Sequence, residues 1–491
     1  MHLTIVFNRR NVHSQNYQNS GYWFFPDITA GRRPMKIPLR PPPIDELFKS
    51  ILDDEGAQRI GHVLSRHIDA TPGGKYRHWD VLRHLEPPSD LSVKEWWLGV
   101  KLARRSSYQP LPFQDRNGNE FKYGVPNLAY RMLHRIDRDA GGAIRGSDQI
   151  TSPHSRDMYL LKSLVEEAIT SSQLEGAATT REVAKEMLRE GRQPHNRSER
   201  MIYNNYQAMQ FIQNLGKQQL TRGIILEMQR ILTEQTLDDP GAAGRLRRPD
   251  EPIHVVDPAD GKSLHIPPEA NDLDKRLDVL CAFANSTESE SFMHPVMRAI
   301  LLHFALAYDH PFVDGNGRTA RALFYWSMRA QGYWLCEFVS ISSILRMAPA
   351  QYARAFLYTE TDENDTTYFV LYQLRVLIQA IEKLHRYLQR KSEELRETRM
   401  YLQQSKMLRA ALNHRQLAII NHALKNPLFT YSIESHRGSH GVSYQTARTD
   451  LLHLAELGLL DKGKIRRAFV FVAPADLHDR LRGVAPAVGQ G

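Results

Sequence analysis

This chain has few cysteines and no long apolar stretch, which excludes several classes of protein. Its two cysteines, Cys281 and Cys336, provide neither a disulfide framework nor a CxxC metal clip, so we expect core thiols in a reducing compartment. No apolar stretch reaches the roughly 18 residues that a membrane-spanning helix needs, and the apolar run at the start is too short for a signal peptide. Internal repeats and long low-complexity segments are missing as well. We therefore expect a soluble, cytoplasmic protein.

What remains is the composition of an ordinary globular protein, with 42% hydrophobic and 24% charged residues. The length of 491 residues suggests three or so domains, since a domain has ~150 residues. The net charge of +9 is uneven, because residues 401–491 contain 12 Lys and Arg against 6 Asp and Glu. This surplus predicts an acidic partner for the C-terminal region.

The most informative segment is HPFVDGNGRTAR, which covers residues 310–321. Apolar residues at helical spacing over 297–305 predict a helix that leads into it. Pro311 disfavours helix at His310 and so places the imidazole where the helix becomes a loop. A second helix, expected from about 318 to 329, would begin beneath this loop, where backbone N–H groups favour phosphate.

The residue types in this loop are those of phosphate chemistry. Asp314 offers a hard oxygen ligand for Mg²⁺, and an imidazole suits a general base near neutral pH. Arg318 and Arg321 lie on one helical face, from which both guanidinium groups can reach one polyphosphate. Three residues allow tight turns whose backbone N–H groups can surround an anion: Gly315, Asn316 and Gly317. We interpret the segment as a phosphate-transfer site.

The same positions match the pattern HxFx(D/E)GNGRxxR, so the segment resembles the catalytic loop of the Fic family. The resemblance implies an enzyme that moves AMP from ATP onto a protein hydroxyl and releases pyrophosphate. It implies His310 as the base and Asp314 as the ligand of a Mg²⁺ ion that bridges the α- and β-phosphates. Asn316 and the neighbouring glycine amides would stabilise charge in the transition state. Arg318 would hold the β-phosphate and Arg321 the γ-phosphate.

Upstream, the segment EEAITSSQLEGA has apolar residues at helical spacing and predicts an amphipathic helix over about 161–176. It resembles the Fic inhibitory motif (S/T)xxxE(G/N), whose key positions are Ser171, Glu175 and Gly176. The resemblance implies that Glu175 pairs with Arg321, so that the γ-phosphate cannot seat and ATP binds unproductively. A solvated surface glutamate is the alternative.

Between the two motifs, two β-prone runs around an Asp-Gly turn predict a hairpin over about 252–268. It occupies the place of the Fic flap, which in that family pairs with the target chain as an added strand. Gly244 and Arg245 resemble the entry to that flap. We expect His254 and His265 to be exposed rather than metal ligands, because no Cys or carboxylate cluster accompanies them. An isolated surface hairpin is the alternative.

The rest of the chain divides by pattern. Residues 1–145 form an N-terminal accessory region without recognisable chemistry, whose tryptophans we expect in the core. The Fic core is expected over 146–390 and a connector helix over 391–412. The apolar stripe of the long helix from about 368 thins as charge rises, which leaves a coiled-coil homodimer contact open.

Residues 413–481 show helices and a hairpin in an order that resembles a winged helix-turn-helix, which lays its third helix into the DNA major groove. The side chains that would face bases or phosphates are Ser443, Tyr444, Gln445 and Arg448 of that helix, and Lys462, Lys464, Arg466 and Arg467 of the wing. Winged helices also dock proteins, so DNA binding and protein docking both remain open.

The sequence thus predicts a mainly α protein, with a Fic helical bundle and β-hairpin flap, an N-terminal accessory region and a C-terminal winged helix-turn-helix. We expect a protein adenylyltransferase that uses ATP and Mg²⁺ to modify a Ser, Thr or Tyr hydroxyl of a target and of itself, and that Glu175 inhibits. Removal of AMP by the same site, and a DNA-binding regulator that senses nucleotide, are the alternatives. An unbroken catalytic loop favours an enzyme, because a sensor has no need for His310. Phosphorylation by a Doc-like relative is disfavoured, because such relatives lose glycine and arginine at the positions of Gly317 and Arg321.

Overall fold

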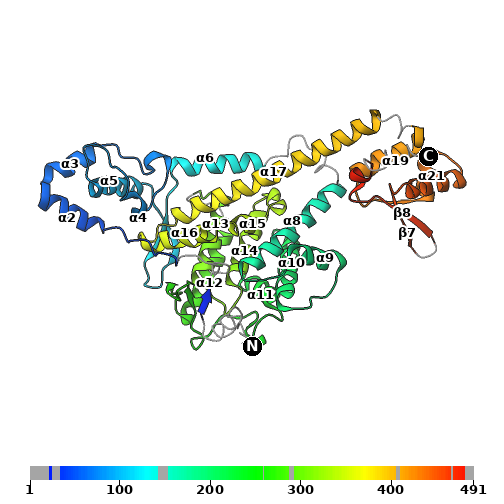
Figure 1. The fold of residues 1–491 in the computed structure, drawn as a ribbon. Coiled ribbons are helices and arrows are strands. Elements are labelled where there is room, and N and C mark those ends of the chain that lie inside the picture. Colours follow the sequence, from blue (N-terminus) through cyan, green and yellow to red (C-terminus); the bar gives the residue numbers. More distant parts are fainter. Residues whose placement is uncertain are drawn as a thin grey trace, which may run out of the picture. The chain divides into compact units, whose positions relative to one another are not determined.

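The computed structural model describes residues 22–24, 34–141, 153–257, 259–286, 292–404, 410–465 and 468–481. Most of them lie in helices, and the sheets that they form have only two or three strands (Figure 1), so the mainly helical fold is confirmed. The chain divides into two compact units, residues 1–142 with 163–381 and residues 143–162 with 382–491. In the described part of the chain, no helix combines the length and the apolarity needed to cross a membrane.

The N-terminal region of the first unit consists of short helices and one hairpin. Its elements are α2 (Ile44–Glu55), α3 (Ala57–Ser65), α4 (Trp79–Leu82), α5 (Val93–Arg105), β2 (Gln109–Gln114), β3 (Glu120–Tyr123) and α6 (Asn127–Ile136). Helix α5 begins at a capping box, in which the side chains of Ser92 and Glu95 each accept a hydrogen bond from the other's backbone N–H. Trp96 and Trp97 are buried between these helices, which confirms the core position expected for them.

A buried charged network holds this region against the helices that follow. Lys101 Nζ on α5 lies 2.7 Å from Asp362 Oδ1, and both side chains are almost fully buried. Arg104 stacks 3.7 Å from the centre of the Tyr76 ring and donates to the Tyr368 hydroxyl over 2.7 Å. Because a buried charge that loses its partner costs several kcal/mol, roughly 3–5, the network fixes the accessory region on the helical core.

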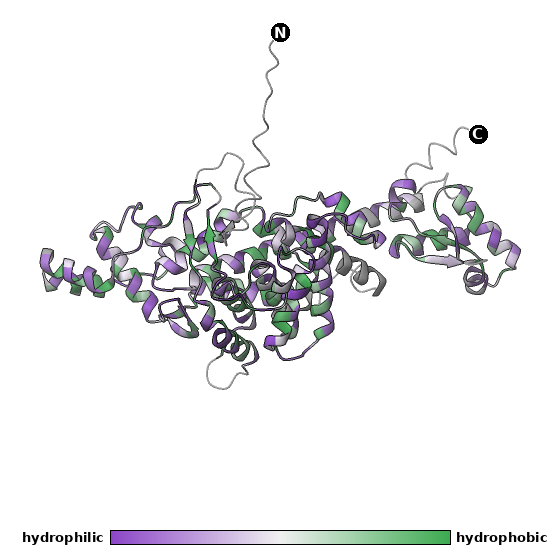
Figure 2. Cartoon of the chain, turned by 90° about the horizontal axis from the view of Figure 1, so that it is seen from below, coloured by the Kyte–Doolittle hydropathy of each residue, from purple (hydrophilic) through white to green (hydrophobic). Residues whose placement is uncertain are grey.

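The helical core is built around two consecutive helices. Helix α13 (Pro295–Asp309) is buried from its second residue to its last, and α14 (Asn316–Ala330) is buried along most of its length. Such helices cannot face water and must be covered by others. The surrounding helices are α8 (Pro153–Leu174), α9 (Arg181–Glu190), α10 (Arg197–Leu215), α11 (Arg222–Thr233), α12 (Leu273–Asn285), α15 (Ser342–Leu345), α16 (Pro349–Thr361) and α17 (Thr367–Gln404). Figure 2 shows hydrophobic and hydrophilic residues mixed along most helices, as expected for amphipathic helices that cover a buried core.

Short turns of tighter or wider helix join these elements. They are η2 (Pro72–Gly74), η3 (Asp137–Gly141), η4 (Pro240–Ala242), η5 (Ala270–Asp272) and η6 (Trp334–Phe338). Of the two cysteines, Cys336 is buried as expected and Cys281 is half-buried, and neither forms a disulfide.

The hairpin predicted over 252–268 is confirmed as β4 (His254–Val256) and β5 (Ser263–His265), which pair antiparallel. A third strand, β1 (Tyr22–Phe24), pairs parallel with the other edge of β4. The sheet order is therefore β1-β4-β5, with β4 in the middle. An extended segment from the N-terminal part of the chain thus completes the hairpin sheet.

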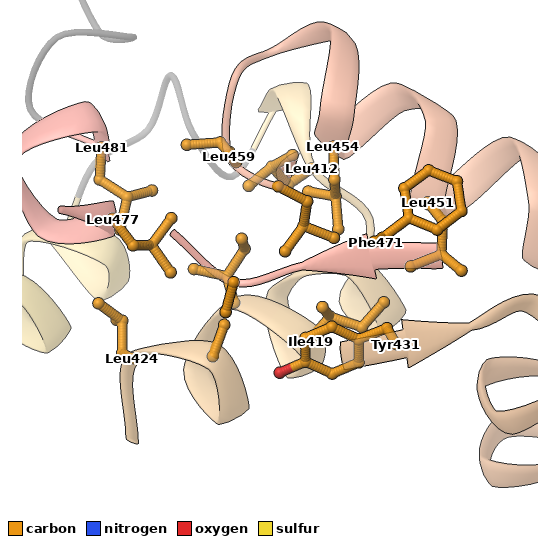
Figure 3. Packing of buried hydrophobic residues seen from close by; sticks show 14 of the residues in the cluster. Leu412, Ile419, Leu424, Tyr431, Leu451, Leu454, Leu459, Phe471, Leu477 and Leu481 are labelled. Carbon is orange, nitrogen blue, oxygen red and sulfur yellow. The ribbon is translucent and has the colours of Figure 1, made fainter. Parts of the chain in front are cut away.

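The second unit ends in three helices and a small sheet. They are α19 (His414–Lys425), β6 (Thr430–Ser432), α20 (Ile433–His440), α21 (Tyr444–Glu456), β7 (Asp461–Ile465) and β8 (Ala468–Val472), with the strand order β6-β8-β7. Figure 3 shows Tyr431, Leu451 and Phe471 among the side chains that form its apolar core. Asp450 on α21 is also buried and accepts from Arg415 over 2.8 Å and from Asn413 over 2.7 Å, so it ties α21 to the start of α19.

Candidate active site

The loop between α13 and α14 takes its shape from a few backbone and side-chain bonds. His310 ends α13 in a left-handed conformation with φ 42°, and Gly315 precedes α14 in the same left-handed region with φ 86°. Asn316 braces the loop, because its Oδ1 accepts from Phe312 N over 2.9 Å and its Nδ2 donates to Phe312 O over 2.8 Å. Phe312 itself is fully buried. Asn316 thus acts on the loop directly, and the role in charge stabilisation that the sequence predicts for it remains a prediction.

The imidazole of His310 is oriented by the helix that it caps. Its Nδ1 contacts the carbonyl oxygen of Ala307, which can only accept a hydrogen bond, so the proton resides on Nδ1. Nε2 is then left as the acceptor, which is the form that a general base needs. Burial, helped by the charge of nearby His265, lowers the pKa of His310 to about 3 and keeps the ring neutral at physiological pH.

Asp314 and Arg318 form the second part of the site. Arg318 Nη2 lies 3.0 Å from Asp314 Oδ1, and Arg318 Nη1 donates to Leu232 O over 2.7 Å. The buried Nε of Arg318 has no hydrogen-bond partner among the described residues. A buried donor without a partner is costly, and an anionic ligand such as a phosphate would satisfy it.

The residues fit Mg²⁺ when a substrate shares in holding the ion. Hydrogen bonds from described residues reach only Oδ1 of Asp314, so its other carboxylate oxygen is available. Within the described ranges, no group of three or more His, Cys, Asp or Glu side chains is arranged to hold a metal ion. Mg²⁺ is commonly held by one or two carboxylates together with substrate phosphates, and Asp314 suits that arrangement.

The segment that resembles the inhibitory motif contacts the segment that resembles the catalytic loop, as the resemblance implies. Arg321 Nη2 lies 2.8 Å from Glu175 Oε1, while its Nε donates to Ser171 Oγ over 2.9 Å and its Nη2 to Ser171 O over 3.1 Å. Arg321 is 2% exposed; burial alone would lower its pKa, but Glu175, Tyr352 and Glu167 together outweigh burial and raise it. Gly176 takes a left-handed φ of 91° directly after this contact, where the chain leaves α8.

Gly317 is packed against the same ion pair. A Cβ atom at this position would lie 2.2 Å from Glu175 Oε1, which is closer than atoms can approach, and 3.1 Å from Arg321 Nη1, which is a tight contact. A side chain at position 317 would therefore require the carboxylate end of Glu175 to shift from its present position beside Arg321.

One cavity brings together some of these groups, although Asp314, Asn316 and Arg318 are not among the residues that line it. It is lined by Glu175, His310, Gly317 and Arg321 and by apolar side chains of α13, α16 and the β4–β5 hairpin, among them Val255, Leu264 and Phe356. The end of α8, the loop between α13 and α14, and the hairpin are far apart in the sequence but face one space.

The expectation that His265 is exposed was wrong. Its side chain is 9% exposed and lines the cavity, because β5 folds it against the end of α13. His254 on β4 is half-buried rather than exposed. The alternation of side chains along a strand could not predict the burial of His265, because both faces of the hairpin contact other parts of the protein.

Two further residues that sequence reasoning missed support the loop from outside. Arg247 donates through Nε to His310 O and through its backbone N to Pro311 O, both over 2.9 Å, and also contacts Pro268 O. Gln229 on α11 donates to Asp314 O over 3.0 Å and accepts from Gly244 N. The resemblance of Gly244 and Arg245 to the entry of the Fic flap was the only signal near them.

In the second unit, the residues expected to contact DNA lie on the surface. Ser443, Tyr444, Gln445 and Arg448 are exposed at the start of α21, and Ser443 also caps this helix by accepting from Thr446 N. Lys462 and Lys464 are exposed on β7, where both ammonium groups lie near the Phe469 ring, at 4.5 Å and 5.7 Å from its centre. Arg466 and Arg467 lie outside the described residues.

Comparison with known proteins agrees with this site. Residues 219–328, which include the hairpin and the catalytic loop, match the Fic/DOC family. The chain is 27% identical over 295 residues to a protein adenylyltransferase Fic of Drosophila ananassae, and 28% identical to that of Drosophila melanogaster over the same length. Each match covers 59% of this chain and 55% of the relative, so the chain spans about half the length of the curated relatives that it matches.

Solved structures with partial similarity include a Fic family protein from Desulfovibrio desulfuricans, with a TM-score of 0.46 and 18% identity over 74% of this chain and 99% of that one. Another is Fic-1 from C. elegans, with a TM-score of 0.41 and 23% identity over 53% of this chain and 72% of that one. From the family match and the similar sequences, this chain is a Fic/DOC family protein related to the Fic protein adenylyltransferases.

Proposed function

We propose that this chain transfers AMP from ATP to a hydroxyl group of a protein. The observation that carries the proposal is the shared cavity, in which the proton-accepting imidazole of His310 lies together with Gly317 and Arg321. The hydroxyl oxygen would attack the α-phosphorus, the bond to the bridging oxygen would break, and pyrophosphate would leave. The hydroxyl proton would pass to Nε2 of His310.

The other residues of the loop would position the phosphates. Arg318 would contribute its unpaired Nε–H and Arg321 its guanidinium, while the backbone N–H groups at the start of α14 would stabilise the growing charge. Asp314 would hold Mg²⁺, which supplies positive charge to the phosphates when it is bound. Asn316 and Arg247 would keep the loop in this shape through their backbone contacts.

The contact between Glu175 and Arg321 supports autoinhibition. The Arg321 guanidinium already uses its Nε and Nη2 on Ser171 and Glu175. A γ-phosphate that needs the same group must therefore displace the glutamate, since one planar guanidinium has few directions in which it can bind anions.

The β4–β5 hairpin would receive the target protein as a flap. The pairing of β1 with β4 supports this role, because it shows that an edge of the hairpin accepts an extended chain. While β1 occupies that edge, a target segment must pair with β5 or replace β1.

The test is incorporation of label from α-labelled ATP into lysate proteins and into the chain itself. His310→Ala should reduce incorporation by about 10²–10⁴ without abolishing ATP binding, because the imidazole handles the proton rather than the phosphates. His195→Ala, which removes an exposed histidine far along the chain from this loop, is the matched control. Transfer at the wild-type rate in His310→Ala would refute the mechanism. If labelled protein loses its label faster in the presence of the wild-type chain than without it, AMP removal would be favoured.

We also propose that residues 413–481 form a winged helix-turn-helix that binds duplex DNA. Support comes from the element order, the β6-β8-β7 sheet and the exposed polar residues at the start of α21. Retention of the full chain on duplex DNA should fall steeply with salt, and a Lys462→Ala/Lys464→Ala double variant should flatten that dependence relative to Lys217→Ala. No retention even at low salt would leave protein docking as the role.

A further inference from the structure

We propose that His265 is a positioning residue for the reaction, a charged imidazolium that joins the flap to the catalytic helix and keeps His310 free to accept a proton. The proposal rests on the proposed AMP transfer. His265 ends β5, and its ring lies between two other elements. Its Nδ1 is 2.9 Å from Glu360 Oε2 on α16, and its Nε2 is 2.7 Å from the carbonyl oxygen of Tyr308 on α13.

The hydrogen bonds themselves indicate the charge. A backbone carbonyl only accepts, so the nitrogen facing Tyr308 must carry a proton. A carboxylate also only accepts, so the nitrogen facing Glu360 must carry one too. A neutral ring would present a lone pair to one of these oxygens at hydrogen-bond distance. The two contacts are both satisfied by an imidazolium paired with a carboxylate.

The surroundings of the ring favour that charge despite its burial. The groups that face it are Glu360 on α16, Tyr308 and Asp309 at the end of α13, and His310 in the loop, with Arg276 and Arg247 beyond Asp309 and His310. Burial by itself lowers the pKa of His265, but Glu360, the Tyr308 carbonyl and Asp309 together outweigh burial and raise the pKa. The Tyr308 carbonyl belongs to the last turn of α13, where a cation is favoured by the helix dipole.

Two consequences follow for the reaction. The His265 and His310 ring centres are 6.1 Å apart, so the cation opposes protonation of the base. The bond to Tyr308, two residues before His310, also fastens the flap beside the base, where a target hydroxyl must approach.

Two substitutions separate these effects. In Glu360→Gln, the amide can donate to Nδ1 while Nε2–H still donates to Tyr308, so the hydrogen bonds persist and only the charge is lost. The acid limb of kcat/KM should then move up by about one pH unit, a tenfold change at the affected pH, with KM for the target unchanged. His265→Gln loses the charge and one bond, so the same shift should appear together with a several-fold rise in target KM. His195→Gln, an exposed histidine outside the hairpin and the catalytic loop, is the control and should change neither.

A measurement without turnover separates this inference from the proposed function. In the full chain with ¹⁵N-labelled histidine, the His265 ring should show two protonated nitrogens at pH 7, assigned by their loss in His265→Gln, and should become neutral at pH 7 in Glu360→Gln. This result is decisive even if the chain transfers no AMP. A neutral His265 at pH 7 in the wild type would overturn the proposal, and so would an unchanged acid limb in both variants of an active enzyme.

Discussion

Replacing Glu175 by glycine should activate the enzyme while destabilising the empty protein, which is an unusual combination. In the structure Arg321 has one carboxylate partner, Glu175, and two contacts with Ser171. The substitution removes the carboxylate and leaves a buried guanidinium with neutral partners only. ATP can then use Arg321 without displacing another anion.

The size of the effect follows from burial. Breaking a fully buried ion pair costs roughly 3–5 kcal/mol. The Glu175 side chain is 15% exposed, and the charge of buried Glu167 also acts on Arg321, so we expect a smaller loss of about 2–3 kcal/mol. The same free energy no longer opposes productive ATP binding, which corresponds to a rise in transfer rate of about 30-fold to 150-fold.

Two measurements check this prediction. Thermal unfolding of Glu175→Gly without nucleotide should occur about 5 °C below that of the wild type. ATP at about 100 times its Kd for the variant should stabilise Glu175→Gly by about 2.7 kcal/mol. The same ATP concentration should stabilise the wild type less, because in the wild type ATP must first displace the glutamate. Glu227→Ala is the control, because Glu227 pairs with Arg230 over 2.7 Å on the surface and should change neither quantity appreciably.

The rate of AMP transfer, measured with α-labelled ATP, decides between three outcomes. A rise together with the larger ATP-induced shift supports autoinhibition. Unchanged values for both would refute it and leave α8 as ordinary scaffold. A fall in activity would show that Glu175 takes part in the reaction, and AMP removal would become the leading hypothesis.

Three further predictions follow from particular contacts. Gly317→Ala places a Cβ against Glu175 Oε1, so it should destabilise the wild type by about 1–3 kcal/mol. In a Glu175→Gly background the same substitution should destabilise the protein clearly less. If urea unfolding shows that the effects of the two substitutions are additive, the contact is contradicted. Burial lowers the pKa of His303 to about 3 and that of His78 to about 4. The contribution of these neutral rings to stability is therefore complete above the unfolded pKa of ~6.5 and is lost as the pH falls. At pH 5 the loss is about 2 kcal/mol for each ring. His303→Gln should therefore lessen the acid destabilisation measured by urea unfolding, and an equally steep decline in this variant would count against a neutral buried ring. Trp23→Pro should disrupt the pairing of β1 with β4 and raise target labelling if β1 competes with the target; unchanged labelling would show that the target pairs elsewhere.

The sequence predicted the local parts of the site well. The apolar spacing before His310, the proline after it and the two glycines led to a helix, a loop and a second helix, and α13 and α14 have that arrangement. The β4–β5 hairpin followed from its turn residues in the same way. These features depend on neighbours in the chain, whose conformational preferences act over a few residues.

The ion pair between Glu175 and Arg321 was expected only through resemblance to a family. The two residues are 146 positions apart, and no periodicity or turn signal relates them. Their contact exists because Ser171 on α8, one turn before Glu175, also binds Arg321, and because Gly317 leaves room for the carboxylate.

The residues that tertiary structure alone identified are those whose partners come from distant segments. His265 was predicted to be exposed, yet it is buried between Glu360 and the end of α13. Gln229 and Arg247 carry no motif, but they hold the catalytic loop by its backbone carbonyls. By itself the sequence indicated the chemistry to which the loop is suited, since that depends on residue types and their spacing. Only the packing of helices decided which charges surround the loop, because electrostatic interactions depend on distance in space and on exclusion of water rather than on order along the chain.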